Sequence, residues 1–388
     1  MSLKIFALLL LTHQALAWFE NCDHSYSITN TILLQSPYYS NRYPSGSSCR
    51  YHFIAPQGKT IRAKCTIELD KPSSACSTEF FYVALDGDKL MKNSKYYCGS
   101  GQIEVTSYSR EMVLAYTSSS QQTAGRFSCT LSLADCDCGW SMSSKIVSGT
   151  ETRVNEFPSM VALIYEPNKS VFCGGTIINE YYVMSAAHCF YQTMYNNPSQ
   201  IRARVGEHDV KTNAESQYTR DYLVSSITFH NQYSPTNDLN DIAVVRVSTP
   251  FEWSVGVGPS CLPYSYQNTD FTNAYAVIVG WGTQEFAGPV STVLQKATVV
   301  VDSANNCRQY YPSLTTNQIC TKPQYYSNSD SCQYDSGGPV YYIGQRHYSL
   351  GVISYGQYCG NQKPSINTKV VSYLPWLKSV TGADFCQK

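Results

Sequence analysis

The chain of 388 residues has little charge and no excess of either sign. Charged side chains make up 14% of it, and 28 Lys and Arg residues are balanced by 28 Asp and Glu residues. A weakly charged, neutral chain gives no long-range attraction toward nucleic acid or toward an anionic membrane. We therefore expect neither as a partner.

The sequence also lacks an apolar run long enough to span a bilayer, which needs about 18 residues. The longest early run, 5–11, is short; it follows Lys4 and precedes Ala15-Leu16-Ala17. A positive start, a short apolar stretch and a small-x-small site are typical of a secretory signal peptide. Residues 1–17 are predicted to be that peptide, with a buried N-terminal helix as the alternative. The mature protein is then secreted and extracellular.

Zinc-binding cysteine patterns are missing as well. No C-x-x-C pair is followed by a second pair, and Cys136 and Cys138 form only C-x-C. We therefore expect no zinc, and we assign no metal ligand and no cofactor from the sequence. The 16 cysteines are an even number behind a signal peptide, which indicates a disulfide-bonded extracellular protein.

Long amphipathic helices and internal repeats are absent until the C-terminus, where 371–378 suits a terminal helix. Residues 22–134 contain short alternating stretches such as 51–54, 80–85 and 112–116, which predict an antiparallel β-sandwich. Short strands resume after residue 146. The sequence thus predicts an all-β protein with the following division: signal peptide 1–17, first module 18–135, linker 136–145 and second module 146–388.

Three short strings in the second module can carry chemistry together. They are SAAHC with His188, NDIAV with Asp241, and DSCQYDSGGP with Ser336. A serine hydroxyl is a weak nucleophile that needs a base to accept its proton. His188 can serve as that base, while Asp241 fixes its tautomer and stabilises the imidazolium. Each residue alone would be an ordinary core or turn residue, but the three strings in this order favour nucleophilic catalysis.

The order of these strings resembles that of trypsin-like serine proteases, and the resemblance extends over 146–387. It implies two six-stranded β-barrels followed by a C-terminal helix, and serine endopeptidase activity. It also implies an activation site in Lys145-Ile146-Val147-Ser148-Gly149. Cleavage after Lys145 by an upstream protease would free the Ile146 amine to pair with Asp335, and a buried ion pair of this kind can act as a switch.

Substrate specificity follows from the same resemblance. Asp330 takes the place of the pocket-floor carboxylate that binds Arg or Lys, while Ser354 and Gly356 belong to the strand that pairs with substrate backbone. A solvated surface aspartate is the alternative reading of Asp330. Ser365 stands where the family has Gly, and Asn367 where it has Tyr, so we expect a narrowed pocket for protein substrates cleaved after Arg or Lys.

The oxyanion hole departs from the family pattern. The amides of Tyr334 and Ser336 would form it, but the family has Gly at the position of Tyr334. Tyr keeps the N–H while losing the backbone freedom of Gly. We expect catalysis to survive and the ring to exclude bulky protein inhibitors. A catalytically silent homologue that acts as a binding or cofactor protein is the alternative function.

The resemblance also implies disulfide pairings in the second module. They are Cys173–Cys189, Cys307–Cys320 and Cys332–Cys359, with Cys261 bonded to Cys136 or Cys138 and Cys386 bonded to the linker cysteine left over. The bond of Cys261 would keep the first module attached after activation.

The first module resembles a CUB domain. Its expected disulfides are Cys22–Cys49, Cys76–Cys98 and the additional Cys65–Cys129. Glu79 and Ser118 depart from the calcium ligands of such domains, although Glu68 fits, so no calcium is expected there. The module is either a spacer or a binding domain of unknown ligand.

Three further readings concern context. Asn168-Lys169-Ser170 is a glycosylation sequon. The acidic loop from Glu207 to Gln217 keeps part of the family's calcium ligands, which leaves calcium there open. The pairing of the two modules is similar to insect venom and salivary proteases, those of heteropteran bugs above all, with a developmental or immune cascade protease as the alternative.

Overall fold

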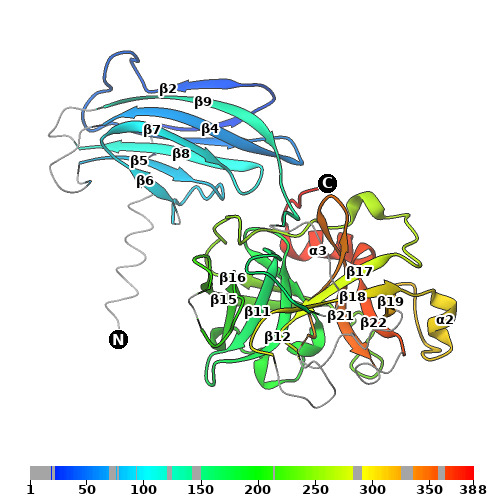
Figure 1. The fold of residues 1–388 in the computed structure, drawn as a ribbon. Coiled ribbons are helices and arrows are strands. Elements are labelled where there is room, and N and C mark those ends of the chain that lie inside the picture. The colour runs from blue at the N-terminus through cyan, green and yellow to red at the C-terminus, as the bar shows by residue number, and fades with distance from the viewer. Residues whose placement is uncertain are drawn as a thin grey trace. The chain divides into compact units, whose positions relative to one another are not determined.

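The computed structural model describes residues 19, 22–69, 76, 78–92, 94–119, 125–141, 150–212, 215–282, 291–324, 335–356 and 363–388. The predicted signal peptide lies outside these residues. The chain divides into two compact units, Met1–Cys136 and Asp137–Lys388. Each unit is built almost entirely from strands (Figure 1).

The first unit is a sandwich of two sheets. A five-stranded sheet has the order β1-β3-β8-β5-β6, and a four-stranded sheet has the order β2-β9-β4-β7. The strands are β1 (Asp23–Ser27), β2 (Ile32–Gln35), β3 (Ser48–Ile54), β4 (Lys59–Glu68), β5 (Glu79–Ala84), β6 (Lys95–Tyr97), β7 (Ser100–Thr106), β8 (Glu111–Ser118) and β9 (Arg126–Asp135).

Alternation along the strands forms the core of this sandwich. In β4, Ile61, Ala63, Cys65 and Ile67 are buried, whereas the residues between them point outward and are exposed. Successive side chains of a strand face opposite sides of the sheet, so this period of two places one row in the core. The predicted stretches 51–54, 80–85 and 112–116 lie in or at the ends of β3, β5 and β8.

One pairing differs from the antiparallel sandwich that the sequence predicts. Strands β1 and β3 run parallel, with Asp23 opposite Arg50. The chain between them is long enough for a crossover, which parallel neighbours require, and it includes β2 of the other sheet. A disulfide between Cys22 and Cys49 joins the beginnings of the two strands, as parallel pairing demands.

The second unit contains two closed six-stranded barrels, as the sequence predicts. The first has the order β11-β12-β13-β16-β15-β14; in the second, β18-β17-β20-β21-β22-β19, a further pairing between β18 and β19 closes the ring. Strand β10 (Thr150–Glu151) adds to β18. The barrel strands are β11 (Met160–Tyr165), β12 (Ser170–Ile177), β13 (Tyr182–Ser185), β14 (Ile201–Val205), β15 (Arg220–Phe229), β16 (Ala243–Val247), β17 (Tyr275–Gly280), β18 (Gln295–Val301), β19 (Gln318–Pro323), β20 (Pro339–Ile343), β21 (His347–Gly356) and β22 (Ser365–Lys369).

Two α-helices are described in this unit, and both are short. Helix α2 (Ala304–Arg308) precedes β19, and α3 (Leu374–Thr381) lies at the predicted terminal helix. The α3 helix buries Leu374 and Leu377, and it ends at Gly382, which has a φ of +63° and donates its N–H to the carbonyl of Lys378. Glycine is favoured at this left-handed position because it has no Cβ.

The segment before the predicted activation site belongs to the second unit. Cys138 is bonded to Cys261, and the Gly139 N–H donates to Pro259 O at 2.7 Å. Trp140 lies against Gly258, where an added Cβ would come within 1.7 Å of its ring. Residues 137–141 are thus packed onto the same unit as the barrels.

Candidate active site

His188 is held by the chain on both sides of it. It lies in a 3₁₀ turn, Ala187–Cys189, directly after β13. Cys189 is bonded to Cys173 of β12, and Ser185 Oγ donates to the carbonyl of Gly174 at 2.8 Å. The turn is therefore tied to the wall of the first barrel, and the imidazole is left partly exposed.

Asp241 lies before β16 and is 0% exposed. Its Oδ2 accepts from Ser354 Oγ at 2.5 Å and lies 2.7 Å from His188 Nδ1, while its Oδ1 accepts from the His188 N–H at 2.9 Å. Its backbone carbonyl accepts from Thr368 Oγ1 at 2.6 Å. A buried carboxylate is costly unless its oxygens are satisfied, and these donors satisfy them.

The two side chains tune each other's ionisation. Burial lowers the pKa of His188, but the charge of Asp241, its hydrogen bond and the charge of Asp238 together raise that pKa above its usual value. Burial likewise raises the pKa of Asp241, and His188 and Ser354 outweigh it, so that the pKa is lowered. The pair thus keeps Asp241 ionised beside a more basic imidazole.

Ser336 is carried by a tight turn before β20. Its carbonyl accepts the N–H of Gly174 at 2.8 Å, and the following Gly337 N–H donates to Ile353 O at 2.9 Å. Gly337 has a φ of +79°, and a Cβ there would lie 2.2 Å from Ser185 Oγ. Glycine is therefore required after Ser336 both for the backbone conformation and for the close approach of the His188 segment.

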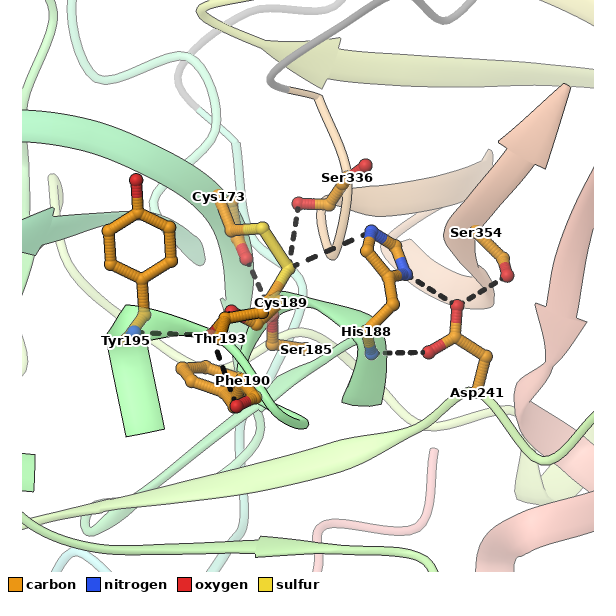
Figure 2. The surroundings of a disulfide bond; sticks show 11 residues. Cys173, Ser185, His188, Cys189, Phe190, Thr193, Tyr195, Asp241, Ser336 and Ser354 are labelled. Carbon is orange, nitrogen blue, oxygen red and sulfur yellow. Dashed lines mark hydrogen bonds and ion pairs between the residues drawn. A yellow bond between two sulfur atoms is a disulfide. The ribbon is translucent and has the colours of Figure 1, made fainter. Parts of the chain in front are cut away.

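Figure 2 shows the three predicted residues together, with His188 between Asp241 and the turn that carries Ser336. They come from two different barrels: His188 and Asp241 flank strands of the first, and Ser336 precedes a strand of the second. One imidazole nitrogen, Nδ1, is hydrogen-bonded to the Asp241 carboxylate. The other nitrogen, Nε2, is left to accept a proton from a hydroxyl. Nucleophilic catalysis with a general base needs this arrangement.

A metal does not fit this site in the described part of the chain. Cys173, His188 and Cys189 bring potential ligand atoms within 4.8 Å of one another, but both sulfurs are consumed by the disulfide. The same holds for Cys22, His24 and Cys49 in the first unit. A disulfide sulfur is no thiolate and binds metal poorly.

Several predicted substrate residues lie side by side on β21 and β22. Gly356 pairs with Ser365, and a Cβ added to Gly356 would lie 2.8 Å from Ser365 Oγ. Asn367, two residues further along β22, is fully buried; its Nδ2 donates to Ile319 O at 3.3 Å and to Thr321 Oγ1 at 3.0 Å. Ser365, which stands where the family has Gly, thus lies opposite β21, the strand predicted to bind substrate.

Other predicted site residues lie outside the described part of the chain. These are Lys145, Ile146, Asp330, Tyr334, Cys332 and Cys359. The residue that Ile146 is predicted to meet, Asp335, is described: its Oδ1 accepts from the Gly282 N–H at 2.8 Å. A Cβ on Gly280 would lie 2.0 Å from that same oxygen, so glycine makes room for the carboxylate.

Both modules contain described disulfides besides Cys173–Cys189 at the site. The bonds are Cys22–Cys49, Cys65–Cys129, Cys76–Cys98, Cys138–Cys261 and Cys307–Cys320. Of the two linker cysteines considered for Cys261, Cys138 is its partner. The pairing of Cys386 stays a prediction.

The acidic residues considered for calcium have protein partners. In the first unit, Glu68 accepts from Arg126 at 2.7 Å, and buried Glu79 accepts from the Gly125 N–H at 2.7 Å. In the second unit, Glu207 accepts from the His208 N–H at 2.9 Å and lies 3.3 Å from Arg204. Burial raises the pKa of Glu207. The carboxylates are thus engaged by side-chain cations or backbone donors.

The predicted sequon is exposed in a turn. Asn168 Oδ1 accepts from the Ser170 N–H at 3.1 Å and from Ser170 Oγ at 2.7 Å. Asn168 is exposed and Ser170 is partly exposed.

Sequence reasoning missed three contacts at the site. Ser354 was assigned to substrate backbone, but its hydroxyl also donates to Asp241; Thr368 supports the Asp241 backbone; and Asp238 acts on His188 electrostatically. No local pattern marks the first two, because their partners are more than 100 residues away. Asp238 could have been noticed as an acidic residue three positions before Asp241.

The comparisons agree with this geometry. A trypsin family model matches residues 146–377, and a CUB domain model matches residues 22–131. The chain therefore belongs to the trypsin family of serine proteases, and it carries a CUB domain before the protease domain. It is a serine endopeptidase, a hydrolase that acts on protein substrates.

Relatives among characterised insect proteins include venom proteases. The chain is 36% identical over 259 residues to a venom serine protease of Polistes dominula, covering 65% of this chain and 91% of the relative. It is 32% identical over 388 residues to venom serine protease 34 of Apis mellifera, and the match covers 95% of this chain and 90% of that relative. A CLIP domain-containing serine protease B9 of Anopheles gambiae is 30% identical over 262 residues, which cover 63% of this chain and 65% of that relative.

Among the described residues, no helix is long and apolar enough to cross a membrane.

Proposed function

We propose that this protein is a secreted zymogen that, once cleaved between Lys145 and Ile146, hydrolyses proteins after Arg or Lys. The observation that carries the proposal is the hydrogen-bonded pair of His188 and buried Asp241 beside the turn that holds Ser336. This arrangement supports acyl transfer through a serine nucleophile.

The reaction begins when Ser336 Oγ attacks the scissile carbonyl carbon and its proton passes to His188 Nε2. The carbonyl oxygen becomes an oxyanion, for which the amides of Tyr334 and Ser336 are the proposed donors. Collapse of this intermediate breaks the C–N bond, and the imidazolium returns its proton to the leaving amine. Water then repeats the cycle on the acyl-enzyme and releases the acid.

Asp241 acts on this cycle through His188. Its hydrogen bond to Nδ1 holds the tautomer that leaves Nε2 free to accept a proton, and its charge stabilises the imidazolium. Ser354 and the His188 N–H keep the carboxylate in place. The raised pKa of His188 is consistent with a general base that is matched to proton transfer near neutral pH.

Tryptic specificity is proposed from Asp330, whose carboxylate would pair with the guanidinium or ammonium of the substrate. Ser365 would narrow the same pocket, and its contact with the position of Gly356 supports this assignment. Ser354 and Gly356 would bind the substrate backbone along the last part of β21, beyond Val352, where the register with β20 ends and β22 is the paired neighbour.

Activation is proposed to act through Asp335. The new Ile146 amine would pair with its carboxylate, which is already held by the Gly282 N–H one residue before Ser336. Cys138–Cys261 joins residues on either side of the cleaved bond, so the CUB domain would remain attached. Secretion is supported by the venom relatives, by the disulfides and by the signal-peptide pattern of 1–17. A venom or salivary role and a glycan on Asn168 are part of the same proposal.

Labelling with an organophosphonate probe tests the proposal. The probe reacts only with a serine that has an active base, so the protein cut after Lys145 should be labelled at Ser336. His188→Ala, which keeps Ser336, should prevent labelling, whereas Asn168→Gln should not change it. Absence of label on a correctly cut and folded protein would favour the silent homologue.

A further inference from the structure

A hairpin beside the catalytic pair presents a second carboxylate. In the loop from His230 to Ile242, Ser234 and Leu239 form an isolated bridge, with the Ser234 N–H donating to Leu239 O at 3.0 Å. The His230 N–H donates to Ile242 O at 3.0 Å and closes the base of the loop. The last residues of this hairpin lead directly into Asp241.

Two residues of the hairpin adopt left-handed backbone conformations, Asp238 at a φ of +50° and Asn240 at +57°. Aspartate and asparagine tolerate this region better than other non-glycine residues. The Asn240 side chain donates to Gln232 O at 2.9 Å and accepts from Tyr373 Oη at 2.9 Å. The backbone directly after Asp238 is thus held by the Ser234–Leu239 bridge and by the Asn240 side chain.

Asp238 is half-buried and weakly satisfied. In the part of the chain that the structure describes, its carboxylate has one hydrogen bond, a long one of 3.5 Å from Tyr233 Oη, and no cation within ion-pair distance. Burial and the charge of Asp241 raise its pKa, whereas His188 and Tyr233 act in the opposite direction. A partly desolvated carboxylate of this kind is stabilised by a cation that arrives from outside.

Tyr233, whose hydroxyl contacts Asp238, belongs to a group of aromatic rings. Tyr191, three residues after His188, meets Tyr233 edge to face at 5.3 Å and Phe229 at 5.3 Å between ring centroids. Aromatic rings beside a carboxylate favour the stem and the charge of Lys or Arg together. The hairpin therefore offers an anionic and aromatic surface next to the general base.

We propose that Asp238 is a specificity-determining residue that binds a cationic side chain of the substrate, at the residue immediately before the one in the specificity pocket. The place of this basic residue in the substrate rests on the proposed function. In that function the substrate backbone would begin its pairing with the enzyme at Ser354, whose hydroxyl contacts Asp241. One residue spans at most about 3.6 Å, so the next substrate residue still lies beside His188 and the hairpin. The enzyme then prefers two consecutive basic residues.

Peptide substrates with Arg in the pocket and Arg, Lys, Gln or Glu before it test this inference. The wild type should cleave the Arg and Lys peptides about fivefold or more faster in kcat/KM than the Gln peptide, the scale of a solvated ion pair. Asp238→Asn, which keeps the shape, should bring the kcat/KM ratio between the Arg and Gln peptides close to one, measured at a pH high enough for His188 to be neutral in both enzymes. Tyr233→Phe keeps the carboxylate and should retain the preference. Equal loss on all four peptides, or a basic preference at another position, would overturn the assignment.

Two further readouts separate this inference from the proposed function. In the Ser336→Ala background, binding of the Arg-Arg peptide should exceed that of the Gln-Arg peptide, and Asp238→Asn should abolish the difference, whether or not the parent enzyme turns over. The groups that face His188 are Asp241 and Asp238. Asp238→Asn should therefore move the acidic limb of the kcat/KM profile to lower pH, which a merely structural role would not do; an unmoved limb together with an unchanged binding ratio contradicts the proposal.

Discussion

His188 and Asp241 are joined by two hydrogen bonds, one to each carboxylate oxygen: the imidazole Nδ1 lies 2.7 Å from Oδ2, and the backbone N–H donates to Oδ1 at 2.9 Å. The second bond fixes the turn that carries the imidazole, so the ring and its backbone are oriented by the same group. Because Asp241 is fully buried, water does not compete for either bond.

The pH dependence of activity should reflect the raised pKa of His188. A general base works only when it is neutral, so kcat/KM should rise as pH increases through that pKa. Burial alone would place the acidic limb below the ordinary histidine value of 6.5, but Asp241 and Asp238 outweigh it and move the limb above that value. A profile measured on activated enzyme checks this, and a midpoint below 6.5 would contradict the electrostatic account.

Asp241→Asn should leave the fold intact and lower kcat by about 10⁴-fold, since the amide favours the wrong imidazole tautomer. Active-site titration and kcat on the same activated sample measure it. Asp221→Asn is the matched control, because it also neutralises a carboxylate, one that pairs with Arg204 at the surface. A loss of less than tenfold would mean that Asp241 does not orient the base.

The ion pair of Glu156 and Lys296 should be important for stability. Nζ and Oε1 lie 2.6 Å apart, and the side chains are only 5% and 7% exposed. Removing one partner leaves the other charge buried, so Lys296→Met should lower the free energy of unfolding by about 3–5 kcal/mol. Denaturant unfolding measures the loss, and the double variant with Glu156→Leu should recover most of it. If the single variant is as stable as the wild type, the pair is not buried in solution.

Cleavage after Lys145 should not separate the CUB domain from the protease domain. Cys138 and Cys261 are bonded across the cleaved position, so the activated protein should run as one molecule without reductant and as two chains with it. Peptide mapping without reduction should recover the Cys138–Cys261 peptide. Recovery of Cys261 in any other linked peptide would contradict this pairing.

Short strings in the sequence predict the candidate site, and alternation of residues predicts the strands. His188, Asp241 and Ser336 each lie in a recognisable string, and period-two patterns gave the strands. The support of Asp241 by Thr368 could not be predicted, because it depends on how β22 passes beneath a loop 127 residues earlier in the chain. The parallel pairing of β1 and β3 was missed for a similar reason, since a strand's own residues do not state the direction of its neighbour.

Amidolysis by the secreted protein, before and after limited cleavage by trypsin, tests the central claim most directly. The substrates are peptides ending in Arg, Lys, Phe or Leu, with Ser336→Ala as the control for residual trypsin. We expect activity on Arg or Lys peptides only after cleavage at Lys145 and none from Ser336→Ala. No activity from a correctly cut and folded protein would contradict the account and support a silent homologue.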